Sequence, residues 1–202
     1  MASESRHIRS RETAGELDIA ANRRAPTWSG RELLGRALWE IVRVPLFAWT
    51  PRQLWAWRRG ILRIFGATIG RDVRICPSVE IAMPWTIRID DEASVGDRAI
   101  LYGLGPIVIG TQATVSQRAH LCAGTHDYRN RDLPLVKSSI TIGPGAWICA
   151  DAFVGPDVAI GHFAILGARG VAMADIPPWT IAAGNPARPL RSRPKFAPRP
   201  TA

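Results

Sequence analysis

Aliphatic residues recur every six positions over most of this chain. The run from Ile69 reads IGRDVR, ICPSVE and IAMPWT, and comparable runs begin at Ile89, Ile109 and Ile142. The first position of each unit is Ile, Leu or Val, the second is often Gly, and the fifth is usually Ala or Val. The fifth position and the next first position lie two residues apart, so both side chains face one side of a strand. The pattern therefore predicts short strands around a narrow core of alternating small and large residues.

The starts of these runs are evenly spaced except at one place. Ile69, Ile89 and Ile109 are 20 residues apart, whereas 33 residues separate Ile109 from Ile142. Three hexapeptides can form one coil of a triangular solenoid, and Gly at the second position suits a corner where the chain turns. A β-sandwich would have turns of variable length, which the constant spacing disfavours. We therefore predict an all-β solenoid of parallel strands over 67-187, with a loop inserted over 126-139.

A first helix is predicted directly after position 28. Ser29 and Glu32 form a capping-box pattern, in which the hydroxyl and the carboxylate satisfy backbone N–H groups at the helix start. Apolar side chains follow at helical spacing: Leu34, Leu38, Ile41 and Val42. Pro45 is expected to stop or kink this helix.

A second helix is expected before the repeats, with Thr50 as its N-cap and Pro51 at its first position. Its predicted apolar face consists of Leu54, Trp57, Ile61, Leu62 and Phe65. Gly66 should end it. Two compatible roles are open for the segment 28-66. It can cover the open end of the solenoid, or its Trp and Arg side chains can lie at an anionic membrane surface.

Arginine dominates both ends of the chain, and 26 Lys and Arg against 17 Asp and Glu give a formal charge of +9. Residues 1-27 lack an apolar period or a secretory h-region and predict a disordered arm, and 188-202 reads as a basic, Pro-rich tail. The charge can attract a phosphate-rich cofactor, anionic lipid or nucleic acid. Nucleic acid is not expected, because no binding motif accompanies the charge.

The cysteines and the apolar segments indicate in which cell compartment the protein lies. The chain has three cysteines without CxxC spacing: Cys76, Cys122 and Cys149. An odd number with this spacing suggests neither a disulfide framework nor a zinc knuckle, and therefore favours a reducing cytoplasm. Glu40 and Arg43 interrupt the most apolar window. We therefore expect a cytoplasmic protein that is soluble or peripheral to the membrane.

Three motifs occur in order: the hexapeptides, GTHDYRN at 124-130, and IPPWTIAAGNPARPLR at 176-191. Over about residues 28-193 the chain resembles the hexapeptide-repeat acetyltransferases, most closely the colanic acid biosynthesis acetyltransferase group. This resemblance implies a left-handed parallel β-helix and a homotrimer with active sites between subunits. It implies acetyl-CoA as a co-substrate rather than a tightly bound cofactor, and O-acetylation of a sugar in exopolysaccharide or surface-glycan synthesis.

His126 is the candidate general base, because it stands where the six-residue phase breaks. Acyl transfer needs a group near neutrality to deprotonate the attacking hydroxyl, and imidazole has a suitable unperturbed pKa. The residue that orients His126 is open, because consecutive side chains commonly diverge, which argues against direct pairing with Asp127. Asp127, Tyr128 and Asn130 are candidates for the acceptor side, with a solvated loop as the alternative.

The resemblance also marks a donor side. Matching the motifs places Ala150 and Ala168 along the pantetheine arm of the coenzyme, although alanines in such an array are otherwise simply inward or corner residues. Arg188 and Arg191 match basic positions that meet the coenzyme A phosphates, with a solvated basic tail as the alternative. Relatives often carry Lys directly before the DIPP element, where this chain has Ala174. One phosphate contact is therefore missing, or Arg169 supplies it.

Two other functions compete with acetyl transfer. A zinc-dependent hydratase on the same solenoid would need three His ligands, but His120 and His126 are six apart and fall on adjacent faces, so no metal site is expected. A membrane-recruited scaffold or binding module would use the basic, aromatic front segment and would not need His126.

Overall fold

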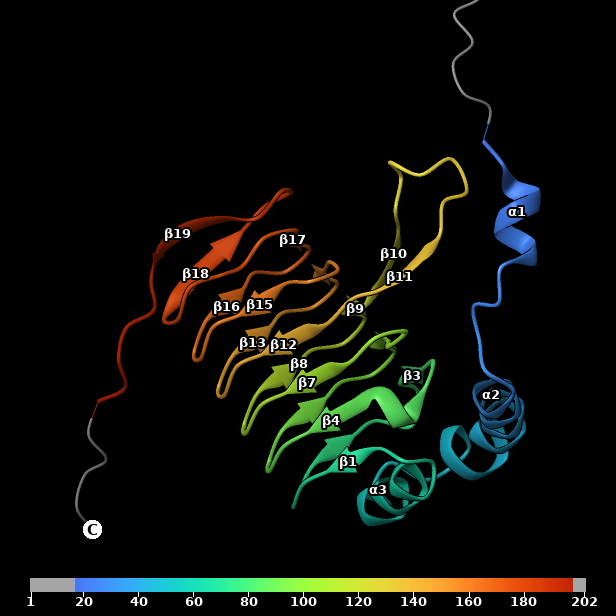
Figure 1. Ribbon diagram of the computed structural model, residues 1–202. Helices are drawn as coiled ribbons and strands as arrows, with labels where there is room; N and C mark the ends of the chain where they lie inside the picture. The colour runs from blue at the N-terminus through green and yellow to red at the C-terminus, as the bar shows by residue number, and fades with distance from the viewer. Residues whose placement is uncertain (1–16, 198–202) are drawn as a thin grey trace, which may run out of the picture. The chain divides into compact units, whose positions relative to one another are not determined.

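The computed structural model describes residues 17–197, which form two compact units. The loop unit joins the described part of Met1–Thr27 to His126–Val136. The solenoid unit holds Trp28–Thr125 with the described part of Lys137–Ala202, and Figure 1 shows its stacked coils.

The coils contribute strands to three sheets that form the three sides of the solenoid. The first sheet contains β1 (Thr68–Ile69), β4 (Ile87–Ile89), β7 (Ile107–Ile109), β12 (Ile140–Ile142) and β15 (Ala159–Ile160). The second contains β2 (Arg74–Ile75), β5 (Ser94–Val95), β8 (Thr114–Val115), β13 (Trp147–Ile148), β16 (Ile165–Leu166), β18 (Thr180–Ala183) and β19 (Arg188–Ser192). The third contains β3 (Glu80–Ile81), β6 (Ile100–Tyr102), β9 (His120–Cys122), β14 (Phe153–Val154) and β17 (Val171–Ala172).

The register of these sheets stacks equivalent hexapeptide positions. Ile89 is paired with both Ile69 and Ile109, and Ile109 with Ile142. These side chains are buried, and small residues of the fifth positions, such as Ala113, are buried beside them. The predicted parallel β-helix is therefore confirmed, with the large and small inward residues in the expected alternation.

The corners explain why Gly is frequent at the second position. A Cβ on Gly96 would lie 2.7 Å from the backbone nitrogen of Gln117 in the next coil, so close backbone approach excludes a side chain. The left-handed conformation falls two residues later, on non-glycine residues such as Arg98 (φ 56°) and Arg118 (φ 57°). The turn itself therefore does not require glycine.

The front segment consists of α2 (Gly30–Val42), the π-helical η1 (Arg43–Ala48) and α3 (Trp55–Ile64). The predicted capping box of Ser29 and Glu32 is confirmed. The predicted start of the second helix was wrong, because α3 begins at Trp55 with Leu54 as N-cap. The Thr50 hydroxyl instead donates to the carbonyl of Phe47 (2.6 Å).

Of the predicted apolar face of the first helix, only Val42 packs against the core. Leu34, Leu38 and Ile41 are exposed, whereas Trp39 is buried. The Trp39 indole N–H donates to the carbonyl of Ile81 in the first coil (2.7 Å), and its ring packs edge-on against Phe47. A hydrogen bond to the coil, together with one aromatic anchor, therefore sets how α2 is oriented.

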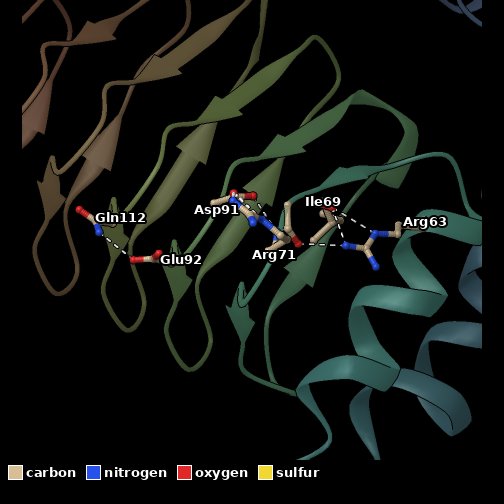
Figure 2. Close-up of polar contacts among 7 residues, drawn as sticks. Arg63, Ile69, Arg71, Asp91, Glu92 and Gln112 are labelled. Carbon is tan, nitrogen blue, oxygen red and sulfur yellow. Dashed lines mark hydrogen bonds and ion pairs between the residues drawn. The ribbon is translucent and has the colours of Figure 1, made fainter.

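Donors from α3 reach other carbonyls of that first coil. Arg63 donates to the carbonyl of Ile69 (2.7 Å), as Figure 2 shows. Arg59 donates to Val73 (3.0 Å) and the buried Arg58 to Ile75 (2.7 Å). Ile61 and Leu62 of the predicted apolar face are buried as well, so α3 covers the open end of the solenoid with both arginine donors and apolar side chains.

The two ends of the chain differ from the expected arm and tail. Residues 1–16 of the arm predicted over 1-27 lie outside the described residues, but Ile19–Arg24 forms helix α1. The tail expected from 188 onward begins with β19, which pairs antiparallel with β18. Beyond it, Arg193 donates to the carbonyl of Phe163 (3.1 Å). Among the helices of residues 17–197, none has the length and apolar character needed to cross a bilayer.

Candidate active site

His126 ends strand β10 (Gly124–His126), which pairs with β11 (Leu135–Lys137) to form the stem of the inserted loop. The loop closes on itself, since the backbone N–H of Asp127 donates to the carbonyl of Pro134 (3.0 Å). The imidazole of His126 is exposed. The break in the six-residue phase therefore marks the start of a two-stranded stem.

The backbone orients His126. Its Nδ1 lies 2.6 Å from the carbonyl oxygen of Leu133. A carbonyl can only accept, so Nδ1 must carry the hydrogen, and in the neutral ring Nε2 keeps the lone pair. Nε2 is therefore the nitrogen available to take a proton. The orienting group left open by the sequence is a main-chain carbonyl and not Asp127.

The polar side chains after His126 are partly engaged in shaping the loop. The Asp127 carboxylate accepts from the backbone N–H of Arg129 (3.0 Å), and the Asn130 side-chain oxygen accepts from that of Asp132 (3.0 Å). Such local bonds are typical of Asx turns. Tyr128 is 79% exposed, and the Arg129 guanidinium lies over its ring, 5.7 Å from the ring centre.

Helix α1 supplies a residue that the sequence did not reveal. The side-chain amide of Asn22 donates to the carbonyls of Asp132 and Leu133, both at 2.7 Å. The backbone N–H of Asp18 donates to the carbonyl of Arg131 (2.9 Å). The carbonyl that holds His126 is thus held in turn by Asn22. No motif surrounds Asn22, so the sequence carried no signal for it.

Ala150 and Ala168 share one corner of the solenoid unit. They occupy the same position in adjacent coils, where the backbone N–H of Arg169 donates to the carbonyl of Ala150 (2.9 Å). Ala150 is partly buried and Ala168 is exposed. Arg169 follows directly with an exposed side chain. The corner therefore offers small side chains beside a cation.

Arg188 lies near that same corner. In the β18–β19 pair, Arg188 is opposite Ala183, whereas Arg191 is opposite Ile181. A Cβ built on Gly167 would lie 2.9 Å from that of Ala183, so the end of β18 adjoins the turn that contains Ala168. The solenoid unit thus brings Ala150, Ala168 and Arg188 to one end of the second sheet. Arg191 lies three residues farther along β19.

The histidines that the structure describes, His120, His126 and His162, form no metal centre. His120 is on the third sheet, His126 is on the loop stem, and His162 occupies a turn between the first and second sheets. His7 lies outside the described residues. Between residues 17 and 197, no cluster of three or more His, Cys, Asp or Glu side chains is placed to hold a metal ion.

Known proteins share both this fold and much of this sequence, although no family model matches. A hexapeptide-repeat acetyltransferase of Vibrio cholerae, solved with acetyl coenzyme A, has a TM-score of 0.74 at 24% identity and covers 83% of this chain and 91% of its own. Galactoside acetyltransferase with coenzyme A also has a TM-score of 0.74, at 22% identity, covering 81% and 83%. The fold is thus that of the hexapeptide-repeat acetyltransferases.

The sequence narrows this class further. The colanic acid biosynthesis acetyltransferase WcaF of Escherichia coli (strain K12) is 42% identical over 156 residues, which are 77% of this chain and 86% of WcaF. The galactoside O-acetyltransferase of the same strain is 27% identical over 141 residues, which are 66% of this chain and 68% of that protein. The chain therefore belongs to the WcaF family of acetyltransferases.

Proposed function

We propose that the protein transfers an acetyl group from acetyl-CoA to a hydroxyl of a sugar, in the synthesis of an exopolysaccharide or another surface glycan. Membership of the WcaF family supports the reaction and the class of acceptor. The observation that carries the chemistry is the imidazole of His126, which is oriented by the carbonyl of Leu133 and has Nε2 available.

In the proposed reaction, Nε2 of His126 takes the proton of the acceptor hydroxyl as its oxygen attacks the thioester carbonyl carbon. The new carbon–oxygen bond gives a tetrahedral intermediate. When this collapses, the carbon–sulfur bond breaks and the imidazolium returns the proton to the departing thiolate.

We assign donor binding and acceptor binding to two separate groups of residues. Ala150 and Ala168 would let the pantetheine arm approach the corner closely, and Arg188 and Arg191 would bind its phosphates, with Arg169 in place of the lysine that relatives carry before DIPP. Arg169 suits this role because it is exposed directly beside Ala168. On the acceptor side, Tyr128, Asp127 and Asn130 would contact the sugar.

The proposed working form is a cytoplasmic homotrimer with active sites between subunits, in peripheral contact with anionic membrane and without a nucleic-acid partner. The trimer is supported by the largely apolar outer surface of the third sheet. That surface presents Ile100, Tyr102, Phe153, Val171 and Met173 together with Glu80 and His120.

The test is a coenzyme A release assay with acetyl-CoA and a panel of sugars and sugar nucleotides. His126→Ala should lower kcat by about 10²- to 10⁴-fold, the usual loss for a general base. His162→Ala is the matched control, because it removes another exposed histidine and should keep the wild-type rate. Equal rates for His126→Ala and wild type would refute the base. Absence of release with every acceptor would favour the scaffold instead.

A further inference from the structure

The front segment carries a continuous apolar stripe on its outer side. Helix α2 runs directly into η1, and Leu34, Leu38, Ile41, Pro45 and Trp49 follow one another at intervals of four, three, four and four residues. Such intervals place side chains on one side of a helix. Leu34 is 62% exposed, Ile41 70% and Trp49 79%. These five residues are called the outer stripe.

The opposite side of the same helix is fixed to the solenoid. Trp39 and Phe47 are buried, and the Trp39 indole is hydrogen-bonded to the first coil. The helix cannot turn its outer stripe inward without breaking these contacts. The stripe is therefore an outward surface whose orientation the fold determines, with a single side available to a partner.

The charge of the front segment indicates which partner fits. Residues 28-66 contain seven Arg and two Glu, a formal charge of +5. Three of these arginines, Arg58, Arg59 and Arg63, donate to the first coil, and Arg52 pairs with Asp97, so the cations on the α2–η1 helix are Arg31, Arg36 and Arg43. Glu32 pairs with Lys137 and Glu40 with Arg43, so both carboxylates are already matched by cations. Arg31 is exposed on the first turn of α2 and precedes Leu38 by seven residues, which places it beside the stripe. Apolar side chains flanked by cations complement an anionic lipid surface.

We propose that the outer stripe binds membranes that contain acidic phospholipids, with the α2–η1 helix lying in the plane of the interface. Trp49 would sit at the level of the headgroups, where indoles are favoured. A second copy of the chain is the less suitable occupant, because two such surfaces would bring like charges together. The benefit of membrane binding rests on the proposed function, because binding would hold the enzyme close to a lipid-linked sugar.

The test is co-sedimentation of the full chain with vesicles of phosphatidylcholine alone or with added phosphatidylglycerol. Binding should require the acidic lipid and weaken as salt is raised. The double variant Ile41→Ser with Trp49→Ser should bind at least about tenfold more weakly, because two apolar side chains leave the interface. Arg31→Glu should lose about fivefold or more, as expected for loss of one cation near the surface.

Leu190→Ser is the matched control, because Leu190 is also exposed but lies on β19. It should bind vesicles like wild type. Equal vesicle binding by the double variant and this control would overturn the proposal, and so would a double variant whose oligomeric mass falls while vesicle binding is kept. The double variant should release coenzyme A with a soluble sugar at the wild-type rate, which separates loss of docking from loss of catalysis.

Discussion

The carbonyl of Leu133 connects helix α1 to the proposed base. It accepts from His126 Nδ1 at 2.6 Å and from the amide of Asn22 at 2.7 Å. A carbonyl oxygen has two lone pairs, so it can serve both donors. Leu133 also has φ 45°, an uncommon conformation for a residue with a side chain. The direction of this carbonyl is therefore held by its partners and not by local backbone preference.

Replacing Asn22 should slow the reaction without weakening the binding of acetyl-CoA. Asn22→Ala removes two hydrogen bonds to the loop, each worth about 1 kcal/mol, so we expect kcat to fall about three- to tenfold with KM for acetyl-CoA unchanged. Steady-state kinetics measure both quantities. Arg23→Ala, on the same helix with an exposed side chain, is the control and should match wild type. Equal kcat values for the two variants would contradict the role of Asn22.

At this scale the sequence identified the proposed base but not its surroundings. His126 was marked by a break in the six-residue phase, which is a local property of the chain. Its orienting partner is a main-chain carbonyl, which any residue could provide. Asn22 is 111 residues from Leu133, and no periodicity links positions so far apart. Both contacts arise only when the chain is folded.

The front segment supplies hydrogen-bond donors to carbonyls of the first coil that the solenoid leaves unpaired. Within the array, the N–H groups of one coil donate to the carbonyls of the next, as Gly70 does to Ile89. The carbonyls of the first coil have no preceding coil, and unpaired buried carbonyls are costly. Side chains of the front segment donate hydrogen bonds to the carbonyls of four first-coil residues: Ile69, Val73, Ile75 and Ile81. This is why the arginines of α3 face inward beside the buried Ile61 and Leu62.

Arg58 is the cap residue whose loss should cost most stability. It is fully buried and donates to Ile75, Thr50, Pro51 and Arg52. Arg58→Ala should lower the free energy of unfolding by about 2–4 kcal/mol, because several buried acceptors lose a charged donor. Arg58→Lys should recover little, since an ammonium lacks the fork of a guanidinium. Arg74→Ala, at an exposed position on β2, is the control for denaturant unfolding. Equal midpoints for Arg58→Ala and this control would refute the assignment.

The unpaired carbonyls of the first coil also explain why the buried side of α2 was predicted wrongly. The start of α2 was predictable because a capping box is local to Ser29 and Glu32. The buried side of α2 was not predictable, because hydrophobic periodicity assumes that the apolar side turns inward. Here the solenoid end demands hydrogen-bond donors, so Trp39 and the arginines of α3 turn toward it and Leu34 remains outside.

Across the whole solenoid, the outer surfaces of two sheets differ in chemistry. The first sheet presents Thr68, Arg88, Val108, Thr141 and Ala159 outward. The third sheet presents mainly apolar side chains around His120, whose buried Nε2 has no hydrogen-bond partner in the part of the chain that the structure describes. A buried nitrogen among apolar neighbours is tolerable only while the imidazole is neutral.

Acidification should therefore lower thermal stability through His120. Burial lowers the pKa of His120 below its usual 6.5, and Glu80 on β3 opposes this only in part, while Tyr102 and Phe153 flank the ring. His120 binds a proton more readily in the unfolded chain than in the folded protein. Its contribution to the free energy of unfolding is therefore fully present above about pH 6.5, the usual histidine pKa, and is lost as the pH falls below that value. Melting temperatures across this range should fall less steeply in His120→Gln than in wild type. Identical slopes would contradict the assignment, and His162→Gln should leave the slope unchanged.

The same surface should hold the proposed trimer together. Wild type should sediment at about three times the chain mass of 22.1 kDa. Tyr102→Glu combined with Met173→Glu places two charges on the exposed part of the third sheet, which should dissociate the assembly because buried unpaired charges are costly. Coenzyme A release should then fall with the loss of trimer, since the proposed active sites lie between subunits. Thr141→Glu adds a charge to the exposed surface of the first sheet and should stay trimeric. If Thr141→Glu dissociates while the double variant does not, the interface lies on the first sheet and this assignment is wrong.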